Sequence, residues 1–437
     1  MCDIAARLSD VLDDSSIVTW AAVSAEQQQA VMEALSSASP PACLALPGTV
    51  EALGKVMALA ATHHWRVLPT GQGTKLSWGG TAEAIDLVVS TARLNRVIEH
   101  AVGDFTVTVE PGVQVAELRR ILAEQRQFLA IDPAFDERAT IGGVVATADT
   151  GSLRQRYGGL RDMLIGVQFV RYDGEQARAG GRVVKNVAGY DLMKLLTGAY
   201  GSLGILSELT FRLYPIQASS RTLVLSGEAK AIEAATAQVR LSGLTPVALD
   251  VVMQTSAAAQ QQARHLALIA RFQGIEAGLA EQTARLKKIA TTHSLSCQQL
   301  DGEADSQFWQ QVADEIKPYT VLCKVGLRPS GIPGLIKLIE AVDLNAQARL
   351  YGTSGLGWIQ FEQADKSVDE IVESLEKLRS HCQNNAGFLT ILQASKALKQ
   401  KIDVWGYSGN ALGVMDDIKR KFDPQRLLSP GRFVGGL

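Results

Sequence analysis

The stretch between Gly181 and Tyr214 constrains the fold most, because it combines short apolar segments with closely spaced glycines. Its expected parts are a strand ending at Lys185, a helical pattern at 192–196, a run of glycines (Gly198, Gly201, Gly204) and a strand at 205–213. Glycines this dense allow positive φ angles and close backbone approach. Such a backbone suits a flat, hydrogen-bonding cofactor ring. A loop that merely needs glycine turns explains the local pattern equally well.

A second glycine-rich turn follows an expected strand–helix–strand unit. The strands are expected at 43–46 and 66–68, and Thr49 is placed to cap the helix between them. The turn consists of Pro69, Thr70, Gly71, Gln72, Gly73, Thr74, Lys75 and Leu76. Several N–H groups pointing into one concavity form a nest that can hold phosphate. A Rossmann fingerprint does not fit, because Leu76 replaces the last glycine and the following residues do not open a helix.

These motifs resemble the FAD-binding domain of flavoproteins related to vanillyl-alcohol oxidase and p-cresol methylhydroxylase (the PCMH type). More narrowly, VVKNVAGYDL followed by GSLGILSELTFRL resembles the glycolate oxidase (glycolate dehydrogenase) complex, and most of all its smaller FAD-binding E subunit. The resemblance covers about Pro41 to Pro215. It resumes in the C-terminal sequence F-D-P-x-x-L-x-x-P-G-R-F, which in this family folds back towards the flavin domain.

The resemblance implies FAD as the cofactor and assigns residues to it. The loop from Pro69 to Leu76 would bind the pyrophosphate, and the segment around 139–148 would lie against the flavin. The remaining expected contacts are Pro133, Thr140, Gly142, Gly143, Thr147, Gly204 and Ile205. Many relatives carry a histidine in the loop that bonds covalently to the flavin. Here His63 and His64 precede the loop and none lies within it, so we expect noncovalent FAD. A helix N-terminus with small packing residues is the alternative for 139–148.

The expected fold class is α+β. A PCMH-type FAD-binding domain of two α/β subdomains precedes an α+β cap domain, in which an antiparallel sheet carries helices on one face. The expected boundaries are an N-terminal helical extension (1–36), the FAD-binding domain (37–216), the cap or substrate domain (217–410) and a segment returning to the FAD domain (411–437).

Composition excludes several classes of protein. A formal net charge of -2 over 437 residues gives no basic footprint for nucleic acid. The N-terminus lacks the pattern of a secretory signal, and no apolar stretch approaches the length of a transmembrane segment. We therefore expect a cytoplasmic protein, associated with a membrane only through partners. The cysteines (Cys2, Cys43, Cys297, Cys323, Cys382) are scattered, which predicts reduced thiols and no iron–sulfur cluster in this chain.

The sequence identifies the catalytic residues less clearly than the cofactor-binding residues. The resemblance implies oxidation of glycolate or a similar 2-hydroxy acid by hydride transfer to FAD, which needs a base and a cation for the carboxylate. In catalytic relatives a histidine-rich metal-binding segment contributes these groups. The matching region, 348–358, contains no histidine, so we expect no metal site. Lys185, Arg349 and Tyr351 are weak candidates for handling the carboxylate; a surface lysine and a solvated strand are the plain alternatives.

Three functions remain open from the sequence. In the first, the chain is an FAD-containing subunit that works with a histidine-bearing FAD subunit and an iron–sulfur subunit. In the second, it is a self-sufficient FAD-dependent dehydrogenase for another hydroxy acid or alcohol. In the third, it is a non-catalytic FAD-binding scaffold. The FAD motifs, together with the missing histidines and clustered cysteines, favour the first.

Overall fold

The computed structural model describes residues 2–182, 189–255, 264–317, 320–363 and 366–437. The chain forms two compact units. The first contains Met1–Thr150, Gly159–Pro215 and Tyr407–Leu437; the second contains Gly151–Gly158 and Ile216–Gly406.

The first unit begins with a small α/β layer. Strands β2 (Cys43–Ala45), β4 (Leu87–Ser90) and β3 (Val67–Thr70) run parallel, and β1 (Ile17–Thr19) adds antiparallel to β2. Helix α3 (Val50–His63) connects β2 to β3, and Thr49 Oγ1 caps it by accepting from the Ala52 amide at 3.1 Å. The apolar stripe of α3 packs on β3 and β4 in one core. The expected strand–helix–strand unit is therefore present.

A five-stranded antiparallel sheet forms the rest of this core. Its order is β5 (Val97–Ala101), β6 (Thr106–Val109), β10 (Ile205–Arg212), β8 (Leu164–Val170) and β9 (Gln176–Gly180). Val170 of β8 and Ile205 of β10 join the same apolar cluster as α3, so α3 links the two sheets. The other elements of the unit are α4 (Val115–Glu124), β7 (Gln127–Phe128), α5 (Ile141–Thr147), α7 (Leu160–Met163), α8 (Leu192–Leu196) and β11 (Tyr214–Pro215).

The N-terminal residues differ from the expected helical extension. Helices α1 (Cys2–Leu8) and α2 (Ala25–Glu33) flank strand β1, which pairs with β2. Leu8 and Leu12 are buried in the core that contains α3. This segment is therefore part of the first unit, because its apolar side chains and its strand both find partners there.

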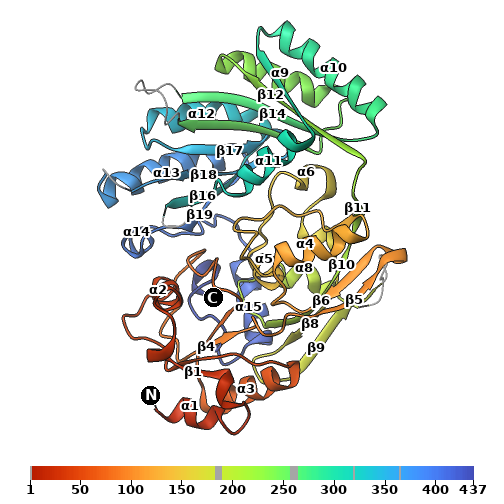
Figure 1. The fold of residues 1–437 in the computed structure, drawn as a ribbon. Helices are drawn as coiled ribbons and strands as arrows, with labels where there is room; N and C mark the ends of the chain where they lie inside the picture. The colour runs from red at the N-terminus through yellow and green to blue at the C-terminus, as the bar shows by residue number, and fades with distance from the viewer. Residues whose placement is uncertain (1, 183–188, 256–263, 318–319, 364–365) are drawn as a thin grey trace. The chain divides into compact units, whose positions relative to one another are not determined.

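The C-terminal segment also lies in the first unit. Figure 1 shows α15 (Leu412–Phe422), in blue, among elements from the beginning of the chain. After α15 the backbone runs beside β3: the Val67 amide donates to the Leu427 carbonyl at 2.7 Å, and the Ser429 amide donates to the Val67 carbonyl at 2.9 Å. Leu428 between them is buried.

The second unit is an eight-stranded antiparallel sheet. Its order is β15 (Ser296–Asp301), β12 (Ser219–Ser226), β14 (Arg264–Gly274), β13 (Ala248–Thr255), β17 (Gln347–Tyr351), β18 (Leu356–Phe361), β16 (Val321–Gly326) and β19 (Phe388–Gln393). Alternate residues such as Leu223 and Leu225 face a single large core, as the period of a strand requires. The predicted antiparallel sheet is confirmed.

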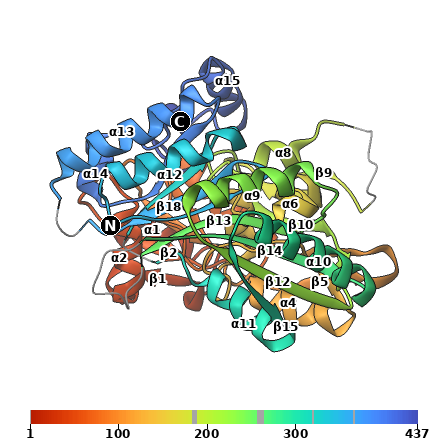
Figure 2. The same ribbon diagram turned by 90° about the horizontal axis from the view of Figure 1, so that it is seen from above.

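Two β-α-β-β-α-β series build this sheet. The helices of the first series are α9 (Ala229–Leu241) and α10 (Glu276–Thr292); those of the second are α12 (Ile332–Ala341) and α13 (Val368–Asn384). Figure 2 shows these four helices across one face of the sheet. Strands β13 and β17 join the two series. Neither α13 nor α11 (Gly302–Ala313) was predicted from the sequence. The short helices α6 (Arg154–Tyr157) and α14 (Lys396–Lys401) complete the unit.

Candidate functional site

The loop after β3 forms one wall of a pocket in the first unit. The following strand holds its backbone: the Thr91 amide donates to the Thr70 carbonyl at 2.9 Å, and Ser90 Oγ donates to the Gly71 carbonyl at 3.0 Å. Gly73 has a φ of +84°, which favours glycine. Held by this turn and these two hydrogen bonds, the loop lines the pocket.

Helix α5 forms the facing wall, very close to the loop. A Cβ added to Gly71 would lie 2.2 Å from Thr140 Oγ1, so only glycine fits at this approach. Thr140 caps α5 by accepting from the Gly143 amide at 3.3 Å, and Thr147 Oγ1 donates to the Gly143 carbonyl at 2.8 Å. The proton of the Thr147 hydroxyl is therefore used within the helix, while that of Thr140 is not committed by this cap.

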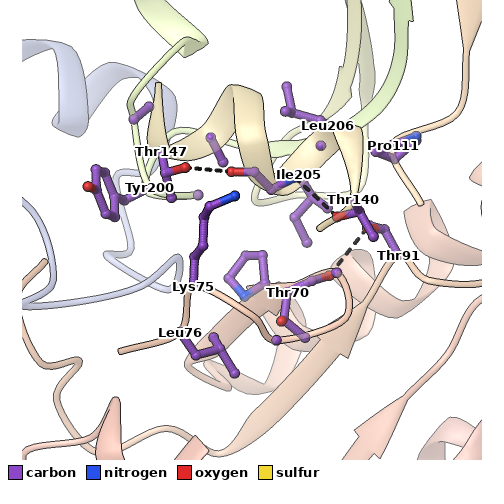
Figure 3. A pocket seen from close by; sticks show the side chains of 18 of the residues that line it. Thr70, Lys75, Leu76, Thr91, Pro111, Thr140, Thr147, Tyr200, Ile205 and Leu206 are labelled. Atoms are coloured by element: carbon purple, nitrogen blue, oxygen red, sulfur yellow. Dashed lines mark hydrogen bonds between the residues drawn. The ribbon is translucent and has the colours of Figure 1, made fainter. Parts of the chain in front are cut away.

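The pocket between these walls is closed by residues from the start of β10 and from the C-terminal segment. Its empty space, which includes open solvent, is about 800 Å³. Figure 3 shows Lys75 pointing towards the centre, with Tyr200 at one end and Thr70, Thr91 and Thr140 at the other. The full lining is Pro69, Thr70, Gly71, Gln72, Gly73, Thr74, Lys75, Leu76, Thr91, Pro111, Thr140, Gly142, Gly143, Ala146, Thr147, Leu196, Ala199, Tyr200, Gly201, Gly204, Ile205, Leu206 and Arg432.

The structure brings nearly all the expected cofactor residues together. Only Pro133 is not part of the lining; the amide of its neighbour Ala134 donates to Asp149 Oδ2 at 2.9 Å. Sequence reasoning did not assign the wall supplied by Leu196 to Gly201, nor Arg432. The P-G-R-F motif was a usable signal for Arg432, because it marks a segment that folds back.

The electrostatics of the pocket depend on buried cations. Lys75 is 6% exposed, and its Nζ lies 3.1 Å from Asp149 Oδ2 and 5.5 Å from the centre of the Trp78 ring. Burial lowers the pKa of Lys75, and the nearby Asp149 opposes this effect. Burial also raises the pKa of the Tyr200 phenol above its usual range. The Tyr200 side chain is therefore an uncharged part of the pocket lining at physiological pH.

The weak catalytic candidates do not belong to the described part of the first unit. Arg349 and Tyr351 belong to β17 in the second unit, and both are buried. The Arg349 guanidinium contacts Asp250 Oδ2 at 2.7 Å and Glu315 Oε1 at 2.6 Å. Arg349 is thus neither on a solvated strand nor offered to a ligand, because two carboxylates already engage its donors. Lys185 lies outside the described residues.

The pocket fits FAD on its own chemistry. A glycine-rich turn and two lining cations suit a dinucleotide with two phosphate charges. Comparison with known proteins agrees: residues 41–180 match the family model described as an FAD binding domain. The chain is a flavoprotein with an FAD-binding domain. FAD is its cofactor, and it belongs to the FAD-dependent oxidoreductases.

Several curated proteins match most of the flavoprotein. It is 24% identical to glycolate oxidase subunit GlcD of Bacillus subtilis over 90% of this chain and 89% of the relative. It is 28% identical to D-2-hydroxyglutarate dehydrogenase of Xanthomonas citri pv. viticola, again over 90% and 89%. Glycolate oxidase subunit GlcE of Escherichia coli is 24% identical over 78% of this chain and 85% of the relative. Both glycolate oxidase subunits are therefore relatives.

Solved structures show the same fold. p-Cresol methylhydroxylase superposes with a TM-score of 0.75 at 15% identity, covering 99% of this chain and 96% of that one. 4-Ethylphenol oxidase from Gulosibacter chungangensis gives 0.76 at 14% identity, with the same coverage. At these identities the comparison establishes the fold alone, and it confirms the resemblance seen in the sequence.

Two features are absent from the described ranges of the flavoprotein. Those residues contain no group of three or more His, Cys, Asp or Glu side chains placed to hold a metal ion. Across the same residues, no helix is both long and apolar enough to cross a bilayer.

Proposed function

We propose that the flavoprotein oxidises a 2-hydroxy acid to the corresponding 2-oxo acid. The observation that carries this proposal is the set of relatives that match about nine-tenths of the chain: a glycolate oxidase subunit, a D-lactate dehydrogenase and a D-2-hydroxyglutarate dehydrogenase. Their names share one chemistry, the oxidation of a hydroxyl next to a carboxylate. Bound FAD supplies the two-electron acceptor, and the pocket in the first unit orients it.

We further propose that the flavoprotein acts as one subunit of a glycolate-oxidising complex. Two glycolate oxidase subunits are among its relatives. Arg349, its candidate for anchoring a substrate carboxylate, is engaged by Asp250 and Glu315. A histidine-bearing FAD subunit would then supply the missing base and anchor, and an iron–sulfur subunit would take the electrons. The proposed setting is the cytoplasm, with membrane association through these partners.

A self-sufficient dehydrogenase is the second candidate. Relatives that match the chain at similar identity are named as dehydrogenases of D-lactate and D-2-hydroxyglutarate. A panel of three 2-hydroxy acids distinguishes the two proposals.

The test is anaerobic reduction of the purified, FAD-loaded chain by glycolate, D-lactate and D-2-hydroxyglutarate, followed by flavin absorbance. For a complex subunit we expect slow or no bleaching by the chain alone, and fast bleaching after co-purification with its two partner proteins. Rapid stoichiometric bleaching of the isolated chain contradicts the subunit proposal and establishes the self-sufficient enzyme. No bleaching by any 2-hydroxy acid, with or without partners, contradicts both and leaves the scaffold role.

A further inference from the structure

Arg432 is a buried arginine with unused hydrogen-bond donors in the wall of the cofactor pocket. It is 4% exposed, and Nη2 donates to the carbonyls of Leu76 at 2.8 Å and Trp78 at 3.2 Å. Within the described part of the chain, Nε and Nη1 have no hydrogen-bond partner. A buried charged donor left unsatisfied costs free energy, so a site that keeps one is organised for something that satisfies it.

Lys75 is a second buried cation in the same wall. Its Nζ lies in the pocket, 3.1 Å from Asp149 Oδ2, and has no well-aligned acceptor among the residues that the structure describes. Asp149 also accepts from the Ala134 amide, and nearby Asp136 is paired with Arg119 at 2.5 Å. Lys75 thus has Asp149 as a carboxylate neighbour, whereas no carboxylate of the described residues lies within ion-pair distance of Arg432.

Lys75 and Arg432 are far apart in the sequence, but Arg432 contacts the backbone of the loop that carries Lys75. Arg432 donates to the carbonyls that follow Lys75, so the C-terminal segment and the loop hold each other in place. We propose that Lys75 and Arg432 form a cationic wall that binds the negative charge of FAD, and that the C-terminal segment completes the cofactor site by supplying Arg432.

The chemistry that the wall recognises is an oxygen-bearing anion of the cofactor. FAD offers such a group in two places: its pyrophosphate, which is always charged, and its isoalloxazine ring, which gains negative charge when reduced. Adjacent guanidinium donors such as Nε and one Nη atom can bind one oxyanion in bidentate fashion. The proposal concerns FAD binding only and does not depend on the identity of the substrate.

The experiment compares Lys75→Met and Arg432→Gln with matched controls. Lys55→Met removes an exposed lysine on α3, and Arg426→Gln removes a half-exposed arginine of the same C-terminal segment. FAD release from each purified holoprotein is measured by flavin fluorescence on dilution. We expect each wall variant to raise the dissociation constant about tenfold or more, the value of one lost charged hydrogen bond, and each control to leave it within about twofold.

Two further measurements identify the anion. If ADP loses its ability to compete with FAD in parallel with the lost FAD affinity, the wall binds the pyrophosphate. If ADP competition is unchanged and the midpoint potential of bound FAD falls by about 30 mV, equivalent to a tenfold change for two electrons, the wall binds the reduced ring. Circular dichroism monitors folding; should Arg432→Gln fail to fold, Lys75→Met decides. Folded wall variants with unchanged FAD affinity and unchanged potential overturn the proposal.

Discussion

The Nη2 atom of Arg432 lies 2.8 Å from the carbonyl oxygen of Leu76, although 356 positions separate the two residues in the chain. Leu76 ends the glycine-rich loop, and Arg432 belongs to the segment that runs beside β3. The loop therefore has two supports: β4 holds its beginning and the C-terminal segment holds its end. Stability of the C-terminal segment and affinity for FAD should consequently be linked.

Gly73 should be required for cofactor binding rather than for folding. An added Cβ would meet only Leu76 Cδ1 at 3.5 Å, so a valine side chain would take up space in the pocket. We expect Gly73→Val to be purified with little or no FAD, as judged by the ratio of flavin to protein absorbance. Gly189→Val is the matched control, because Gly189 has a φ of +83° and open surroundings outside the pocket lining. Both variants carry a backbone strain of about 1–3 kcal/mol, so equal loss of FAD from both would contradict this explanation.

Lys419 should be essential for the stability of the C-terminal segment. Its buried Nζ donates to Asp423 Oδ2 at 2.7 Å and to the carbonyls of Ser202 and Leu428 at 2.8 Å each. Lys419→Met leaves the Asp423 carboxylate buried without its cation, which should lower the free energy of unfolding by about 3–5 kcal/mol in a denaturant titration.

The exposed neighbour Lys421 provides the control for this experiment. Lys421→Met should change stability by less than about 0.5 kcal/mol. Adding Asp423→Asn to Lys419→Met removes the unpaired charge and should recover part of the loss. A double variant no more stable than Lys419→Met alone would show that the buried charge is not the cause.

Arg349 should stabilise the second unit in a pH-dependent way. Burial raises the pKa of Asp250, and the nearby Arg349 opposes this effect. In Arg349→Met the pKa of Asp250 therefore rises further above its unfolded value. A raised pKa favours the folded state at low pH, and this advantage is lost as pH rises through the folded-state pKa. The variant should lose about 3–5 kcal/mol at about pH 8 and clearly less at about pH 5, measured by urea unfolding.

The control for this pH dependence is the double variant Arg349→Met with Asp250→Asn. It carries no titrating carboxyl at position 250, so its stability should differ less between the two pH values than that of Arg349→Met. A loss in Arg349→Met that is the same at both pH values would exclude Asp250 as the titrating group.

FAD should be held without a covalent bond. The lining contributed by the described residues contains no histidine or cysteine, and its one phenol, Tyr200, is kept neutral by burial. Acid or heat denaturation should release intact FAD into the supernatant, identified by its absorbance and its chromatographic retention. Yellow colour that stays with the precipitated protein would demonstrate a covalent link.

Several parts of the site followed from local sequence. The loop from Pro69 to Leu76 was predicted because its glycines permit a tight turn that can point several amides into one concavity. Helix α3 was predicted from its apolar period and its Thr49 cap. Helix α13 was not predicted, although Ser367 and Glu370 form a capping box at its start.

The sequence by itself determined the glycine turns, the amphipathic elements and the resemblance to FAD-binding domains, because each of these depends on neighbouring residues and their order. Only the tertiary structure decided which distant groups meet. It joined β1 to β2, placed Arg432 behind the loop of Lys75, and gave Arg349 two carboxylate partners. Such pairings are set by how whole elements pack, and the energy of a buried charge depends on partners that local sequence does not specify.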